Sequence, residues 1–209
     1  MNTIQQLTKI FSEFPGIGPR QAKRFVYYLL SRNGIYIEQL CSLLMELKKE
    51  ISVCEECFRY FPQGRTVNSL CDICRSANRD VSQLMIVGRD VDFENIEKSH
   101  FWNGRYFILG GNVPILEKNP ELKIRLNEML IQVEKRGLNG LSEIVLGLSA
   151  NPEGEYTGQY VRQALSSLCD KYKIKISVLG RGLSTGTELE YSYPDTIKNA
   201  LLNRHQGNF

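Results

Sequence analysis

Apolar residues recur with a helical spacing of three and four through the first fifty residues of the chain. The expected helices run over residues 3–13, 20–31 and 36–51. Thr3 and Gln6 fit a capping box at the start of the first helix. Two glycines and two prolines in residues 14–19 must end that helix, and Asn33-Gly34 is expected to end the second. The front of the chain is therefore expected to be a small helical module.

After residue 80 the pattern changes to short apolar runs separated by amphipathic segments. The expected strands are residues 84–87, 106–109, 143–148 and 174–179. The expected helices are residues 93–99, 121–136, 157–170 and 194–204. Strands that alternate with helices predict βαβ units and a mostly parallel sheet. The fold class is thus α+β, with a helical front and an α/β rear.

Four cysteines between these halves form two C-x-x-C pairs, Cys54 with Cys57 and Cys71 with Cys74. Zinc prefers four thiolate or imidazole ligands in a tetrahedron, and two such pairs fill the coordination sphere. The pattern therefore predicts a structural zinc ion. The alternatives are two disulfides or free thiols, and nothing in the sequence indicates the secretion that disulfides favour. Cys41 and Cys169 fall on apolar helix faces and are expected to be packed thiols.

The composition is that of an ordinary globular protein: 209 residues, 42% hydrophobic and 23% charged. No apolar run is long enough to span a bilayer, and residues 1–14 do not resemble a secretory signal, so we expect a cytoplasmic protein without a membrane partner. Residues 1–79 hold 11 Lys or Arg against 7 Asp or Glu, whereas residues 80–209 hold 15 against 16. Any contact with a polyanion is expected at the front.

Residues 14–19 read Phe-Pro-Gly-Ile-Gly-Pro, which is the turn of a helix-hairpin-helix. Gly16 and Gly18 would let backbone N–H groups approach a phosphate, and the second helix directs its positive end to the same place. Arg20, Lys23 and Arg24 would add charge. These five residues are the predicted DNA-binding set, with contacts to phosphates rather than bases. The alternative is a tight turn between helices that binds nothing.

Acidic residues follow two of the expected strands. Glu153 and Glu155 lie in the sequence Asn-Pro-Glu-Gly-Glu, and Asp90, Asp92 and Glu94 follow the first strand. Carboxylates at this edge could hold Mg²⁺. We favour the alternative of solvated acids near a helix N-terminus, because a magnesium site usually needs a more convergent set.

The order of these parts resembles the RecR family of bacterial recombination mediators over essentially the whole chain. The resemblance rests on the hairpin turn, the four cysteines, the sequences Leu-Gly-Gly at 109–111 and Asn-Pro-Glu-Gly-Glu at 151–155, and the sequences Gly-Arg-Gly-Leu at 180–183 and Glu-Leu-Glu-Tyr at 188–191. It implies a helix-hairpin-helix domain (1–52), a four-cysteine zinc motif (53–79), a Toprim-like domain (80–176) and a C-terminal segment (177–209).

The resemblance also implies a function. Members of this family are non-enzymatic and form ring-shaped tetramers that clamp single- or double-stranded DNA. They act with RecO and RecF to load RecA onto gapped DNA, which implies a location at the nucleoid. By this resemblance Arg20, Lys23 and Arg24 carry the DNA-contact role, and Glu153 and Glu155 bind a partner.

One departure bears on catalysis. The general Toprim pattern has a glutamate at the end of its first strand, and this chain has Gly88 there. Its loss argues against nuclease chemistry and against Mg²⁺. Two other functions stay open. One is a Mg²⁺-dependent Toprim phosphodiester enzyme using Glu153 and Glu155 with Asp90 or Asp92. The other is a zinc-stabilised protein adaptor that does not bind DNA. We interpret the cysteine quartet as a structural staple that sets the angle between the hairpin and the α/β half.

Overall fold

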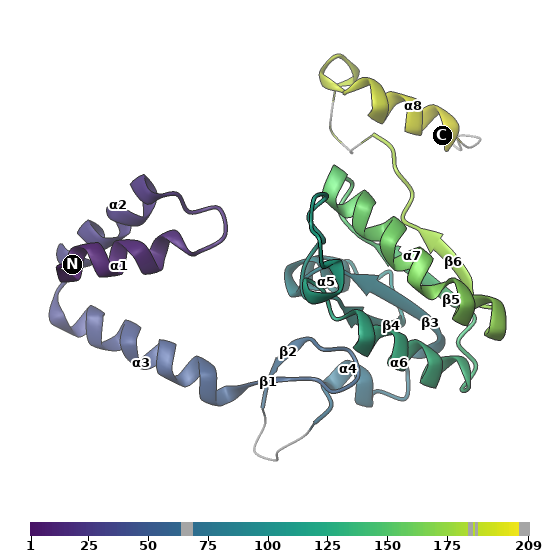
Figure 1. The fold of residues 1–209 in the computed structure, drawn as a ribbon, viewed down its shortest axis with the longest axis horizontal. Helices are drawn as coiled ribbons and strands as arrows, with labels where there is room; N and C mark the ends of the chain where they lie inside the picture. The colour runs from purple at the N-terminus through teal and green to yellow at the C-terminus, as the bar shows by residue number, and fades with distance from the viewer. Residues whose placement is uncertain (64–68, 184–185, 187, 205–209) are drawn as a thin grey trace. The chain divides into compact units, whose positions relative to one another are not determined.

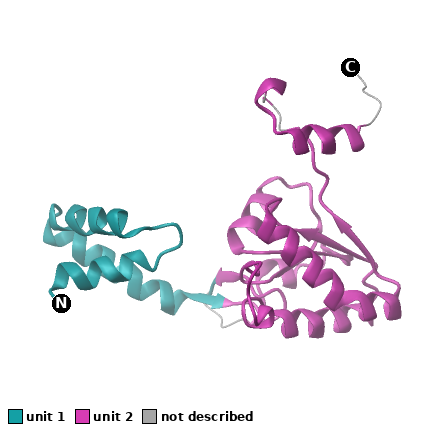
Figure 2. Cartoon of the chain, turned by 45° about the horizontal axis from the view of Figure 1, so that its top comes forward, with its two compact units in different colours: residues 1–52, 62–65 teal, residues 53–61, 66–209 magenta. Residues whose placement is uncertain are grey.

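The computed structural model describes residues 1–63, 69–183, 186 and 188–204. The segments expected over 53–79 and 177–209 therefore each include residues outside the described part. The chain divides into two compact units (Figure 2). Unit 1 comprises Met1–Ser52 with Pro62–Arg65, and unit 2 comprises Val53–Phe61 with Thr66–Phe209. Within the described residues, no helix has the length and apolar character needed to cross a membrane.

Unit 1 contains three helices, α1 (Thr3–Ser12), α2 (Pro19–Leu30) and α3 (Gly34–Glu50) (Figure 1). The first two pack against each other: the rings of Phe11 and Phe25 meet edge to face at 6.0 Å. Ala22 and Val26 on α2 are the buried residues of this pair of helices. The predicted helical front is confirmed.

Two capping assignments differ from the prediction. The capping box of α1 pairs Asn2 with Gln5, not Thr3 with Gln6, because the amide oxygen of Asn2 accepts from the Gln5 N–H at 2.9 Å. Asn33 does not end α2. Its side chain accepts from the Tyr36 N–H at 3.0 Å and so begins α3. In both cases an asparagine is the residue that satisfies a free N–H of the first turn.

Helix α3 is apolar along one face but contains no buried residue. Leu44 and Leu47, which the helical spacing places on that face, are 57% and 56% exposed. The described chain therefore leaves this face of α3 uncovered. A contiguous apolar surface of this kind is typical of an interaction site.

Unit 2 is built on a four-stranded parallel sheet with the order β4-β3-β5-β6 (Figure 1). The strands are β3 (Asp80–Val87), β4 (Gly104–Ile108), β5 (Glu143–Gly147) and β6 (Lys175–Val178). Met85 on β3 is in register with Tyr106 on β4 and with Val145 on β5. The second half of β3, residues 84–87, is a continuous apolar run because both of its faces are buried. The predicted parallel sheet is confirmed.

Helices α6 (Leu126–Gly137) and α7 (Pro152–Tyr172) cover one face of this sheet. The fully buried residues of that layer come from alternate strand positions and from both helices: Leu84, Ile86, Phe107, Ile144, Met129, Val133, Val161 and Leu165. This cluster is the main hydrophobic core.

Helix α5 (Asp90–Lys98) and the cysteine segment cover the opposite face. The strand residues on this opposite face are Met85, Val87, Tyr106, Ile108 and Val145. The cysteine segment contains short elements that were not predicted, namely β1 (Ile51–Val53), β2 (Tyr60–Pro62) and α4 (Asp72–Arg75). β1 and β2 pair as a separate two-stranded sheet, and the boundary between the units falls within them.

The helix expected over 121–136 is shorter. A single 3₁₀ turn, η1 (Pro120–Leu122), precedes α6, which begins at Leu126. The N–H of Arg125 donates to the Leu109 carbonyl at 2.8 Å, so this backbone is tied to the end of β4 and cannot join a helix. Leu122, an apolar residue of the expected helix, lies outside α6 and is 78% exposed.

Helix α7 starts five residues before the expected position 157, because Asn151 caps it with Pro152 in the first turn. The remaining elements are η2 (Leu189–Tyr191) and α8 (Pro194–Leu202). Cys169 is buried as expected, whereas Cys41 is exposed.

Replacing Ile86 by alanine tests the assignment of the core. Ile86 is fully buried in the central strand, so Ile86→Ala is expected to lower the free energy of unfolding by about 2–5 kcal/mol. Ile131→Ala on α6 is the matched control. Its side chain is 65% exposed, and the change is expected to stay within about 0.5 kcal/mol. Urea denaturation measures both, and equal losses would contradict the described core.

Candidate functional sites

The α1–α2 turn is open at its tip. Gly16 has φ 77°, a left-handed conformation that glycine adopts without strain, and the Ile17 N–H donates to the Phe14 carbonyl at 3.0 Å. A methyl group placed on Gly16 or Gly18 would meet no atom within 4 Å. Nothing in the described chain therefore covers the turn, and a ligand can approach its backbone.

The N-terminus of α2 follows directly and is uncapped. Gly18 supplies no side chain to the first turn, Pro19 has no N–H, and the first turn contains no acidic residue. The remaining free N–H groups and the helix dipole give this end a partial positive charge. This is the arrangement that binds anions in proteins.

Three exposed cations lie on the same first turns, Arg20, Lys23 and Arg24. Arg24 donates to the side chain of Gln21 at 3.3 Å, and the Lys23 ammonium lies 5.9 Å from the centre of the Tyr27 ring. Within the described residues, none of the three forms an ion pair with a carboxylate. Their charge is available to a bound anion.

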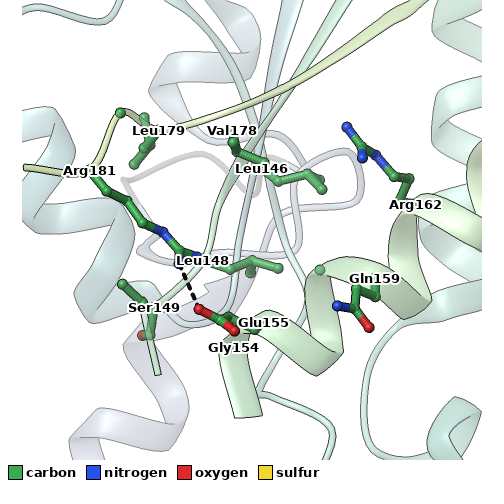
Figure 3. Close-up of a pocket in the computed structure, with 13 residues that line it drawn as sticks. Leu146, Leu148, Ser149, Gly154, Glu155, Gln159, Arg162, Val178, Leu179 and Arg181 are labelled. Atoms are coloured by element: carbon green, nitrogen blue, oxygen red, sulfur yellow. Dashed lines mark hydrogen bonds and ion pairs between the residues drawn. The ribbon is translucent and has the colours of Figure 1, made fainter. Parts of the chain in front are cut away.

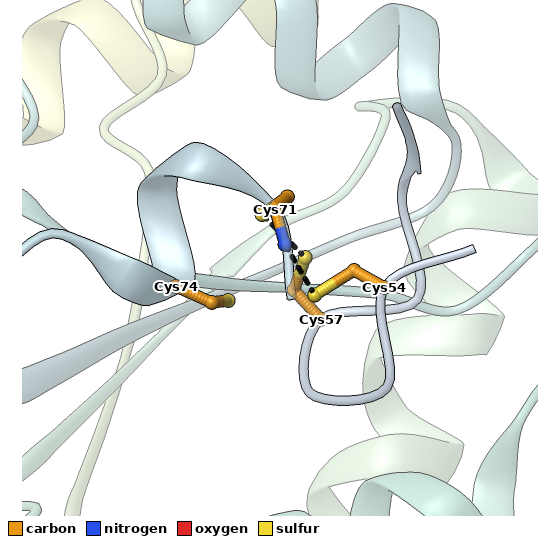
Figure 4. A group of neighbouring side chains, drawn as sticks. All are labelled: Cys54, Cys57, Cys71 and Cys74. Carbon is orange, nitrogen blue, oxygen red and sulfur yellow. Dashed lines mark hydrogen bonds between the residues drawn. The ribbon is translucent and has the colours of Figure 1, made fainter. Parts of the chain in front are cut away.

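The four cysteines converge in unit 2 (Figure 4). All four are buried, and their sulfur atoms lie within 4.8 Å of one another, with 3.6 Å between those of Cys57 and Cys71. A tetrahedral ion with metal–sulfur bonds of about 2.3 Å separates its ligands by about 3.8 Å. The donor set fits such an ion. No other group of three or more His, Cys, Asp or Glu side chains converges in this way within the described part of the chain.

Local backbone contacts shape both cysteine turns. In the first, the Phe58 N–H donates to the Cys54 carbonyl at 2.9 Å, and the Cys54 N–H donates to the Arg59 carbonyl at 3.0 Å. Phe58 takes a left-handed φ of 62°, which costs energy for an aromatic residue, and its ring packs 5.3 Å from that of Phe107. In the second turn, Cys71 is the N-cap of α4.

The close approach of the four thiols favours the binding of a cation. Hydrogen bonding with Cys54 raises the pKa of the Cys57 thiol far above its usual range, and Cys54 is also the main cause of the raised pKa of Cys74. Four sulfurs this close cannot all lose their protons without a compensating charge. A bound metal ion supplies that charge, so the cluster is suited to metal binding.

The acidic residues beside the cysteines are paired with arginines of unit 2. Glu56 lies 3.2 Å from Arg136 and 3.7 Å from Arg105, and Asp72 is paired with Arg59. Arg105 also donates to the Cys74 and Ser76 carbonyls. These contacts fasten the cysteine segment to the sheet, and they leave Glu56 and Asp72 as structural groups.

The carboxyl end of β3 is crowded around Gly88, where the general Toprim pattern has a glutamate. A Cβ on Gly88 would lie 3.0 Å from the side-chain oxygen of Asn112 and 3.2 Å from a carboxylate oxygen of Asp92. Asp92 accepts from the Arg89 N–H at 3.0 Å, and Asp90 accepts from the Tyr60 N–H at 2.8 Å. Both carboxylates are thus engaged in local structure, and neither joins Glu153 or Glu155 in a metal-ligand cluster.

Glu153 and Glu155 lie in the first turn of α7, and both are exposed. Gly154 between them is required by space, because a Cβ there would lie 2.0 Å from the Ser149 carbonyl oxygen. The buried Thr157 accepts from the Val113 N–H at 2.9 Å and donates to the Glu153 carbonyl at 2.6 Å. The turn that presents the two acids is therefore held firmly against the sheet.

Glu155 also borders a pocket of about 450 Å³ at the carboxyl ends of β5 and β6 (Figure 3). Arg181 reaches across it, with 2.6 Å between its Nη1 and Oε1 of Glu155. Sequence reasoning missed Arg181 as a neighbour of Glu155, since 26 residues separate them. It also missed the start of α7, although Asn followed by Pro is a recognisable helix start.

An α1–α2 hairpin, a four-cysteine cluster and a four-stranded parallel sheet define a Toprim protein that carries a helix-hairpin-helix module. Comparison with known proteins agrees. The RecR helix-hairpin-helix family matches residues 4–47, and the Toprim domain family matches residues 82–180.

Relatives named recombination protein RecR align over nearly the full chain. The protein from Chloroflexus aggregans is 30% identical, with 97% of this chain and 93% of that protein covered. The protein from Bdellovibrio bacteriovorus is also 30% identical, with 98% and 97% covered. That from Legionella pneumophila (strain Corby) is 32% identical, with 98% of both chains covered. This chain belongs to the RecR family.

Replacing Cys57 by serine tests the metal cluster. The wild-type protein is expected to carry one metal ion per chain. Cys57→Ser should lose that ion and at least about 3 kcal/mol of stability, because the binding energy of a structural metal is folding energy. Elemental analysis and urea denaturation measure the two effects. Cys41→Ser, at an exposed thiol outside the cluster, should change neither. A Cys57→Ser protein of unchanged stability would show that the cluster has no structural role.

Proposed function

We propose that this chain is a non-enzymatic DNA-binding mediator of recombinational repair. The observation that carries the proposal is the uncapped N-terminus of α2 with the exposed Arg20, Lys23 and Arg24 beside it. Backbone N–H groups of the turn at Gly16 and Gly18, together with these cations, bind DNA phosphates. Phosphate contacts carry no sequence information, so the protein binds single- and double-stranded DNA without sequence preference.

We assign zinc to the quartet Cys54, Cys57, Cys71 and Cys74. Four thiolates form a closed tetrahedral site, and zinc suits this geometry and these soft ligands. The ion supplies charge compensation and holds the segment in place. Because the site has no open position, it has no catalytic role. Mg²⁺ has no part in this proposal, because the nearby Asp90 and Asp92 are engaged elsewhere.

The protein acts as a homotetramer in this proposal. The apolar surface that α3 leaves uncovered in the described chain supports self-association, with Leu43, Leu44, Met45 and Leu47 each more than half exposed. Unit 1 carries few cations, since residues 1–52 hold 7 Lys or Arg against 4 Asp or Glu. Several copies on one DNA would multiply these weak contacts into useful avidity.

The partners in this proposal are a RecO-like and a RecF-like protein, with which the chain helps to load RecA onto gapped DNA at the nucleoid. Glu153 and Glu155 form the partner-binding acids, and their exposure on a fixed turn supports that role. DNA contact belongs to the module 1–52, zinc to 53–79, partner binding to 80–176, and 177–209 forms a C-terminal segment.

Replacing Arg20, Lys23 and Arg24 together by alanine tests the DNA contact. The variant should stay folded and lose DNA affinity by at least about 100-fold at low salt. The slope of log Kd against log salt concentration should fall by about 2–3, because each lost phosphate contact removes about one unit. A mobility-shift titration at several salt concentrations measures both quantities.

The control variant removes three positive charges from unit 2 instead of from α2. Lys118, Lys173 and Lys175 are exposed residues of unit 2. Their triple alanine variant should keep most of the affinity and the salt slope. If both triple variants bind DNA equally, the contact is not at α2. If DNA of unrelated sequences differed by more than a few-fold in affinity, the phosphate mechanism would be wrong.

A further inference from the structure

We propose that the pocket beside Glu155 is a docking site for a basic side chain flanked by apolar residues on a partner protein, and that Arg181 of this chain occupies it as an intramolecular competitor. The inference rests on the proposed role of Glu155 in partner binding. It adds the chemistry of the partner and a regulatory contact at the same site.

The pocket combines an apolar wall with one carboxylate. Leu146 and Leu148 from the end of β5 and Val178 from the end of β6 line it, and Glu155 on α7 stands at its rim (Figure 3). A volume of about 450 Å³ lies within the range of protein ligand sites. An apolar site with one carboxylate at its edge selects an apolar group that has a cation close by.

In the structure, an apolar residue and a cation of this chain already lie at the pocket. Leu179 and Arg181 both line the pocket, and the Arg181 guanidinium lies 2.6 Å from the Glu155 carboxylate. The two side chains are 43% and 49% exposed, so the ion pair is screened by water and is easily exchanged. Val178 remains 62% exposed, which leaves apolar surface for an incoming residue.

A second contact links Arg181 to the end of helix α8. The side-chain amide of Asn203, at the end of α8, donates to the Arg181 carbonyl at 2.8 Å. Helix α8 has no buried residue of its own. Few contacts therefore hold it, and a displacement of α8 would release Arg181 from Glu155 and expose the carboxylate.

Arg162 gives the pocket a positive charge in addition to the negative charge of Glu155. It lines the same pocket, is exposed, and forms no ion pair within the described residues. It follows Glu155 by seven residues on α7, which corresponds to about 10 Å along a helix axis. A partner's cation is repelled at the Arg162 end and directed to the Glu155 end, where it replaces Arg181.

Peptide binding to the full-length protein tests the proposal. The probe is the labelled hexapeptide VLGRGL, the sequence of residues 178–183, and fluorescence anisotropy at low salt reports its binding. Arg181→Ala is expected to bind the probe about threefold more tightly than the wild type, because it removes a competitor that forms only a half-exposed ion pair. Adding Glu155→Gln to this variant should abolish the gain and weaken binding further. Adding Glu128→Gln, at an exposed acid on α6, should leave the gain intact.

Several results would overturn the proposal. They are an Arg181→Ala variant that binds no more tightly than the wild type, a Glu155→Gln change without effect, or equal binding of the control peptide VLGAGL. If the Arg181→Ala protein is unstable on heating, the Asn203→Ala variant is tested in its place. That variant should show a smaller gain in peptide affinity. A lack of any gain would also count against the proposal. If Arg181→Ala lowers the oligomer mass, the true occupant is the C-terminal segment of a second copy. DNA affinity, measured in parallel, depends on α2 and tests the proposed function separately.

Discussion

The cysteine segment covers one face of the parallel sheet, and the rest of unit 2 depends on this packing. Met85, Val87, Tyr106 and Ile108 form a continuous apolar surface that α5 is too short to cover alone. The segment can lie there only if its two turns are held together, and four adjacent thiols need a cation for that. A metal ion bound by the quartet would therefore stabilise the sheet and the cysteine segment together. The burial of the four cysteines and the pairing of Glu56 with Arg136 make the quartet part of a core.

The proposed contacts with DNA and with a partner protein lie at two helix N-termini, whose sequences give them opposite preferences. The start of α2 has no cap and no acid, and three cations lie beside it, so it favours an anion. The start of α7 has an asparagine cap and carries Glu153 and Glu155, so it favours a cation. In the proposed function, the same backbone geometry would serve DNA in one place and a basic segment of a partner protein in the other. The difference lies entirely in the side chains of the first turn.

The sequence was sufficient for the features that depend on local pattern. Apolar runs predicted all four strands of the parallel sheet, and the spacing of Cys54, Cys57, Cys71 and Cys74 predicted their convergence. The features that the sequence did not predict depend on contacts between residues far apart in the chain. The hydrogen bond from Arg125 to Leu109 shortened α6, and nothing local in residues 121–125 indicates it. Helix periodicity correctly marked the apolar face of α3, but it could not say whether anything covers that face. The contact of Arg181 with Glu155 depends on how β6 ends beside α7, which only the fold reveals.

The account's central claim is that DNA is held at the start of α2 and that the cysteine segment is a structural layer. Hydrogen–deuterium exchange of the full-length protein with and without DNA tests both parts at once. Bound DNA is expected to slow exchange of the backbone amides in residues 16–25 and to leave those of residues 53–61 and 69–75 unchanged. Protection of the cysteine segment, with none at residues 16–25, would contradict the claim.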